Sequence, residues 1–131
     1  MALENCNIYF SKPKPFTEGE TFYGTGTKRP IDEHSHKILL ALSPDGKKVW
    51  QYPQSGRGGS WGGTLTTAGG LVFFADDAES FEAVDAETGQ PLWHFNTGQS
   101  FSASPMTYAV NAIQYVAIAA GSDVFTFALP R

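Results

Sequence analysis

Several short stretches of the chain alternate apolar and polar residues with a period of two, a pattern that predicts strands. In the strand predicted around residues 81–84, Phe81 and Ala83 fall on one face. Glu82 and Val84 fall on the other. The turn that follows ends in Gly89, and glycine most readily adopts the left-handed conformation that a short hairpin turn requires. The stretch 82–93 therefore predicts a β-hairpin that closes with Trp93.

An earlier stretch, residues 40–50, repeats this pattern with its own turn at Gly46 and its own closing Trp50. The two copies are offset by about 43 residues, a period typical of propeller blades and other all-β arrays. Apolar runs between turn residues predict the remaining strands. These strands lie at 5–10, 37–43, 48–52, 64–67, 71–75, 106–110, 114–119 and 124–128.

Two polar stretches are predicted to be loops. Residues 16–35 are rich in glycine and polar side chains, with at most a brief strand at 21–23, and residues 53–63 form a second glycine-rich segment. The KPKP run at 12–15 is expected to end the first strand, because proline cannot donate a hydrogen bond to a ladder.

These elements predict an all-β fold, a partial β-propeller of two to three four-stranded antiparallel blades. Residues 1–60 form a loop-rich first blade, 61–101 a complete blade, and 102–131 a truncated last blade without its outer strand. An array of blades whose edge strands are unpaired exposes backbone N–H and C=O groups, so another strand or element must pair with those edges. The expected partners are therefore missing propeller blades, or further copies of the chain that join through open strand edges into an oligomer.

Composition narrows the function classes. A net charge of −4 with scattered basic residues argues against nucleic acid and anionic membranes as partners. The single Cys6 excludes an internal disulfide, and no apolar run is long enough to span a bilayer. The first ten residues have neither a basic region nor an uninterrupted apolar region, so no signal peptide is expected.

Three runs carry a family resemblance. Residues 83–93, A-x-D-x-x-T-G-x-x-x-W, resemble the tryptophan-docking motif of quinoprotein alcohol dehydrogenases. The runs SWGGTLTTAGGLVFFADD at 60–77, and SPMTYAV with QYVAIAAGSDVFTFALP at 104–130, strengthen it. Together they resemble the last blades of that family's eight-bladed propeller, whose members use pyrroloquinoline quinone (PQQ) and calcium. The resemblance implies that Trp50 and Trp93 are structural and lie between adjacent blades.

The same resemblance implies a cofactor contact. In the family, the tryptophan of the W-G-G run reaches the quinone, and Trp61 matches it. The alternative is that Trp61 is another blade-packing aromatic residue. Gly62 and Gly63 would let the backbone approach a planar ligand closely. Asn5 matches a family asparagine near the quinone, although an asparagine at a turn or a strand end explains it equally well.

The family's catalytic machinery is not found in these residues. Its aspartate base, its arginine beside the quinone, its calcium ligands and its vicinal disulfide come from upstream blades. We therefore assign no catalytic and no metal-binding residue, and we expect the isolated chain to be inactive and not to bind PQQ tightly. Asp76 and Asp77 are expected to mark a hairpin turn. The family implies a periplasmic enzyme.

Two alternatives remain. His34 and His36 could lie on one side of a strand, but zinc needs three or four ligands and only His94 and Cys6 could join them, so a solvated loop is favoured. The function could also be that of a non-catalytic propeller scaffold or interaction protein, like the propeller lipoprotein that helps to assemble outer-membrane proteins. That class shares the repeat without the cofactor chemistry.

Overall fold

The computed structural model describes residues 2–4, 9–13, 15–22, 25–28, 36–56 and 62–129, and side chains are described within 15–22, 36–56 and 62–129. All regular structure in these ranges is β-strand, and every strand pair is antiparallel. These ranges hold no helix long and apolar enough to cross a membrane.

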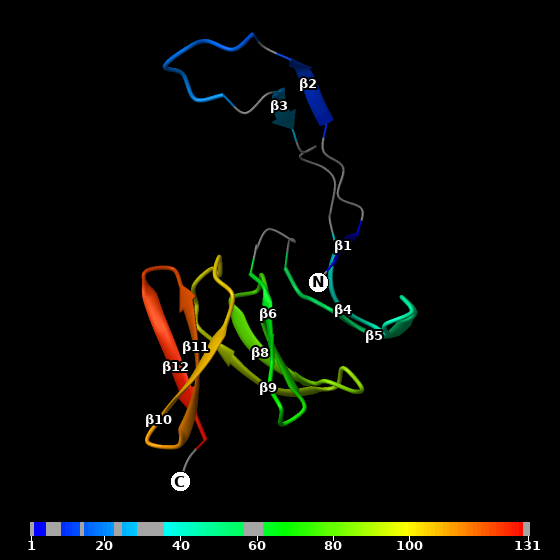
Figure 1. Cartoon of the computed structure of the whole chain (residues 1–131), viewed down its shortest axis with the longest axis vertical. Helices are drawn as coiled ribbons and strands as arrows, with labels where there is room; N and C mark the ends of the chain where they lie inside the picture. Colours follow the sequence, from blue (N-terminus) through cyan, green and yellow to red (C-terminus); the bar gives the residue numbers. More distant parts are fainter. Residues whose placement is uncertain are drawn as a thin grey trace.

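Three sheets follow one another in chain order and lie side by side (Figure 1). The first sheet has the strand order β1 (Ala2–Glu4), β4 (His36–Leu42) and β5 (Lys48–Pro53). The second has the order β6 (Thr64–Thr66), β7 (Leu71–Ala75), β8 (Ser80–Asp85) and β9 (Pro91–Asn96). The third has the order β10 (Met106–Val110), β11 (Ile113–Ala120) and β12 (Asp123–Ala128).

The strands predicted from residue 37 onward are therefore present, with bounds shifted by one or two residues. The second sheet has four strands, whereas three strands are described in each of the other two. The division of the chain into blades at residues 60 and 101 stays a prediction.

The N-terminal region corrects the sequence prediction. Strand β2 (Tyr9–Pro13) pairs with β3 (Thr25–Lys28) in a two-stranded sheet set apart from the other three (Figure 1). Residues 16–35 were predicted to be a loop with at most a brief strand at 21–23, but the strand lies at 25–28, and residues 21–22 are not in a strand. Residues 5–8 of the predicted first strand lie outside the described part.

The prolines were expected to end that strand at residue 12, yet β2 continues to Pro13. Pro13 is the last residue of β2 and pairs with Thr25 across a register shift. A proline is tolerated there because a strand end at an irregular register does not require its missing N–H. The pairing of β1 with β4 was also not predicted.

The alternation predicted for β8 is confirmed by two separate cores. Phe81 is fully buried in a cluster that joins the second sheet to the third, together with Phe101 and Ile118. Val84, on the other face of β8, is fully buried in a second cluster with Leu39 of the first sheet. The second sheet is therefore covered on both faces by its neighbours.

Trp50 makes a specific contact between the first and second sheets. Its indole N–H donates to the carbonyl oxygen of Ala86 at 3.0 Å, and its ring lies against Gly89. A Cβ at Gly89 would lie 2.6 Å from the Trp50 ring, and Gly89 has φ +73°, so glycine is required there for two reasons. Trp93 instead packs edge-on against Phe81 and Phe127, with ring centroids 6.0 and 5.1 Å away.

Candidate functional site

Of the three residues predicted to contact a cofactor, only Gly62 is described. Trp61 and Asn5 lie outside the described residues. Gly62 is buried just before β6, and a Cβ there would lie 2.9 Å from the carbonyl oxygen of Ala103. The N–H of Gly63 donates to the hydroxyl of Ser104 at 2.9 Å. Both glycines therefore approach the segment that leads into the third sheet.

The segment that joins the first two sheets is also held at its other end. Asp76, almost completely buried, accepts the N–H of Ser55 at 2.7 Å and the N–H of Ala78 at 2.6 Å. A Cβ at Gly56 would lie 2.5 Å from the Cβ of Asp77, and φ of Gly56 is +92°. Where the chain leaves the first sheet, it therefore contacts the turn between β7 and β8 of the second sheet closely.

Asp76 and Asp77 lie at the hairpin between β7 and β8, as the sequence predicts. The backbone N–H of Asp76 donates to the carbonyl of Ser80 at 2.8 Å. Asp77 pairs with Lys37 of the first sheet at 3.4 Å, and both side chains are buried. A buried ion pair is costly to break because one charge is left without compensation, so this turn also ties the two sheets together.

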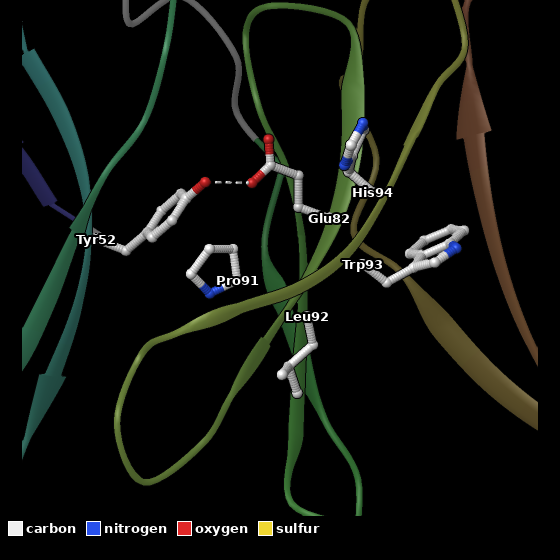
Figure 2. Close-up of a pocket in the computed structure, with 6 residues that line it drawn as sticks. All are labelled: Tyr52, Glu82, Pro91, Leu92, Trp93 and His94. Atoms are coloured by element: carbon white, nitrogen blue, oxygen red, sulfur yellow. Dashed lines mark hydrogen bonds between the residues drawn. The ribbon is translucent and has the colours of Figure 1, made fainter.

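A small hollow of about 180 Å³ opens between the first and second sheets (Figure 2). Within it, the phenol of Tyr52 donates to Glu82 at 2.8 Å. Figure 2 shows His94 beside Glu82, and the two residues are cross-strand partners. The residues that line the hollow are Tyr52, Glu82, Pro91, Leu92, Trp93 and His94.

Burial changes the acid–base properties of this pair. It raises the pKa of the Glu82 carboxyl, and the nearby charge of Asp76 adds to the rise, whereas the hydrogen bond from Tyr52 opposes it. Burial, together with the hydrogen bond to Glu82, raises the pKa of Tyr52 to about 12. The pair therefore favours protonated Tyr52 and makes Glu82 easier to protonate than a solvated glutamate.

The candidate zinc residues are not assembled in the described structure. His36 and His94 are both exposed, on β4 and β9, whereas His34 and Cys6 lie outside the described part. Within the described ranges, no group of three or more His, Cys, Asp or Glu side chains could hold a metal ion.

Sequence reasoning missed the contacts that cross from one sheet to the next. Alternation correctly assigns Glu82 to the face opposite Phe81, but it does not name Tyr52, which lies about 30 residues earlier, as its partner. One signal was available. A glutamate on a strand face that is otherwise apolar needs a hydrogen-bond partner if a neighbouring sheet covers it.

Comparison with known proteins identifies the family. Residues 32–116 match the family described as "PQQ: Glucose/ethanol/alcohol dehydrogenase, beta-propeller domain". The chain is 36% identical over 108 residues to the quinoprotein alcohol dehydrogenase PedH of Pseudomonas putida, covering 81% of this chain and 18% of that protein. It is 40% identical over 114 residues to subunit 1 of the methanol dehydrogenase of Paracoccus denitrificans, covering 82% and 18%.

Solved structures of quinohemoprotein alcohol dehydrogenases also resemble this chain. The quinohemoprotein alcohol dehydrogenase of Comamonas testosteroni matches with a TM-score of 0.64 and 32% identity, covering 77% of this chain and 16% of that one. The quinohemoprotein alcohol dehydrogenase ADHIIG of Pseudomonas putida HK5 matches with a TM-score of 0.68 and 27% identity, covering 89% and 19%. The chain spans less than a fifth of the length of these relatives.

The predicted fold class, an all-β partial propeller, is confirmed by the antiparallel sheets and by these matches. The predicted resemblance is confirmed as well, because the family match covers more than half of the chain. The chain therefore belongs to the PQQ family of glucose, ethanol and alcohol dehydrogenase β-propellers.

Proposed function

We propose that the chain forms the last blades of a PQQ-dependent alcohol dehydrogenase and supplies one wall of its quinone pocket. The observation that carries this proposal is Gly62, which is buried and fixed against Ala103 in a chain of this family. The indole of Trp61 next to it would lie against the quinone, and Asn5 would contribute a polar contact. The W-G-G run would thus combine the closely packed backbone of its two glycines with the aromatic surface of Trp61 for a planar ligand.

PQQ held at this wall would supply the hydride acceptor for oxidation of an alcohol. The residues of this chain bind and orient the cofactor and take no part in proton transfer. The relatives are about five times longer than the chain, and we assign the catalytic base and the calcium ligands to the remainder of such an enzyme. The isolated chain is then inactive and holds PQQ only weakly.

The Trp50 contact supports the blade assignment. Its hydrogen bond to Ala86 and its packing on Gly89 join equivalent hairpins of consecutive sheets. We propose that this contact is the tryptophan-docking arrangement of the family. Its role is structural, because it fixes how one blade lies on the next.

The partners of the chain are the remaining blades of the enzyme, which we place in the periplasm. Among the described strands, β12 has no neighbour on its outer side, and its Val124 is 73% exposed. The third sheet also exposes Met106, Tyr108 and Val110. An isolated chain with such an edge and surface is expected to self-associate. Light scattering tests this, and a monodisperse monomer would contradict it.

The test of the pocket wall is a titration with PQQ and calcium followed by tryptophan emission. The expected result is saturable quenching in the wild-type chain and loss of most of that quenching in Trp61→Phe. Trp93→Phe is the matched control, since it removes an indole that packs between the second and third sheets. If the Trp61→Phe chain is quenched as strongly as the wild type, Trp61 is no cofactor contact. If no variant responds, a non-catalytic scaffold becomes the better assignment.

A further inference from the structure

We propose that Asp76 and Ser104 are positioning residues for the quinone wall, an inference that rests on the proposed function. Neither residue belongs to the W-G-G run. Their side chains instead hold the two described ends of the connection between the first and second sheets, residues 54–56 and 62–63. Ser104 holds the backbone directly beside Gly62, and Asp76 holds the other described end of the same connection.

Asp76 holds the first end with a carboxylate that is only 1% exposed. One oxygen accepts the N–H of Ser55 at 2.7 Å, and the other accepts the N–H of Ala78 in its own turn at 2.6 Å. A carboxylate in this position joins the backbones of two sheets through charge-assisted hydrogen bonds. Asparagine keeps the shape of the side chain but has only one acceptor oxygen, so it cannot make both bonds.

This arrangement differs from that of another turn aspartate. Asp45, in the hairpin between β4 and β5, is exposed and interacts with Ser43 and Lys47 of its own turn. A turn alone therefore does not require a buried carboxylate that reaches into another sheet. The distinguishing feature of Asp76 is its bond to Ser55.

The Lys37–Asp77 ion pair and the close contact at Gly56 reinforce the same end. Lys37 comes from β4, so the turn that carries Asp76 is fastened to the first sheet on two sides. Gly56 leaves no room for a side chain, because its Cβ would meet Asp77 at 2.5 Å. The turn and the start of the connection are therefore fixed relative to one another.

Ser104 holds the second end. Its hydroxyl accepts the N–H of Gly63 at 2.9 Å, and a Cβ at Gly63 would lie 2.5 Å from that hydroxyl oxygen. The adjacent Ala103 carbonyl lies against Gly62. The segment before the third sheet thus holds the backbone of Gly62 and Gly63 in place.

The experiment combines the PQQ titration with amide hydrogen exchange on the full ¹⁵N-labelled chain. The variants are Asp76→Asn and Ser104→Ala, with Ser104→Thr as the conservative rescue and Asp45→Asn as the matched turn control. Asp76→Asn is expected to speed exchange at Ser55, and Ser104→Ala at Gly63. Each should weaken PQQ binding by about tenfold, the size expected for loss of one such hydrogen bond. Ser104→Thr and Asp45→Asn should bind PQQ as the wild type does.

Unchanged PQQ affinity in folded Asp76→Asn and Ser104→Ala would overturn the inference, as would unchanged exchange at Ser55 and Gly63. If Asp76→Asn does not fold, Ser104→Ala carries the test. Ser104 is exposed, so removal of its hydroxyl should cost little stability. If the wild-type chain binds no PQQ, the proposed function fails for the isolated chain. The exchange rates then still decide whether the two side chains hold the segment.

Discussion

The second sheet meets its two neighbours through different chemistry. Toward the third sheet it presents an aromatic cluster in which Phe81 contacts Phe101 and Phe127, with ring centroids 6.3 and 5.7 Å apart. Toward the first sheet it presents a smaller apolar cluster together with directional contacts. These contacts are Trp50 with Ala86, Tyr52 with Glu82, and Lys37 with Asp77.

The difference separates two tasks. Burial of aromatic surface is not directional, and it stabilises the assembly of the second and third sheets. Hydrogen bonds and a buried ion pair depend on distance and angle, so they specify how the first sheet lies on the second. The proposed quinone wall at the W-G-G run comes after the first sheet in the chain, and its glycines contact Ala103 and Ser104 before the third sheet.

The largest expected effect comes from the aromatic side. Phe81→Ala should lower the free energy of unfolding by about 3–5 kcal/mol, because it removes a fully buried ring and leaves a cavity. Urea unfolding measures this loss, which should be similar at pH 6 and pH 8. A loss below about 1 kcal/mol would mean that the cluster can collapse into the space or contributes little to the fold.

An intermediate effect is expected at the Trp50 contact. Gly89→Ala places a Cβ 2.6 Å from the Trp50 ring, and overpacking of this kind costs about 1–3 kcal/mol. Gly70→Ala is the matched control, because Gly70 has a similar φ of +79° but no atom within 4 Å of its Cβ position. The difference between the two variants in urea unfolding isolates the contact from backbone strain. Equal losses would show that Trp50 does not constrain this turn.

The smallest effect depends on pH. Tyr52→Phe should cost about 1 kcal/mol at pH 8, since it removes one hydrogen bond to Glu82. The pKa of Tyr52 is raised in the folded state to about 12 from 10. Its stabilisation is therefore complete below pH 10 and is lost as the pH rises from 10 to 12. Unfolding at pH 8 and pH 11 should show the difference between wild type and Tyr52→Phe shrinking at the higher pH.

Protonation of Glu82 affects stability in the same direction as protonation of Tyr52, but at lower pH. Its pKa is raised in the folded state, so the stability linked to its protonation is present below about pH 4.5 and is lost as the pH rises through the raised value. Glu82→Gln should remove this part of the pH dependence. A pH profile identical to that of the wild type would place Glu82 in contact with solvent rather than between the sheets.

Local pattern was enough to predict most of the strands and the repeat. Alternation assigned Phe81 and Ala83 to one face, and the glycine turns set the hairpins. It failed for β3, where Thr25–Lys28 carries no apolar face and pairs with β2 across a register shift. Strands of this kind are specified by their partner rather than by their own residues.

The candidate site was less accessible to sequence reasoning. The W-G-G run predicted a special role for Gly62, and the structure adds a physical reason in its contact with Ala103. The roles of Asp76 and Ser104 could not be predicted, because each acts on a backbone N–H that any residue type would supply. Such contacts leave no pattern at the position of the donor.

The most direct test of the quinone wall is chemical-shift mapping of PQQ with calcium on the ¹⁵N-labelled chain. The result we expect is a set of concentration-dependent shifts centred on Gly62 and Gly63 and extending to Ala103. Shifts centred on the hollow around Tyr52 and His94, or no shifts at millimolar PQQ, would contradict the assignment of the W-G-G run to the cofactor.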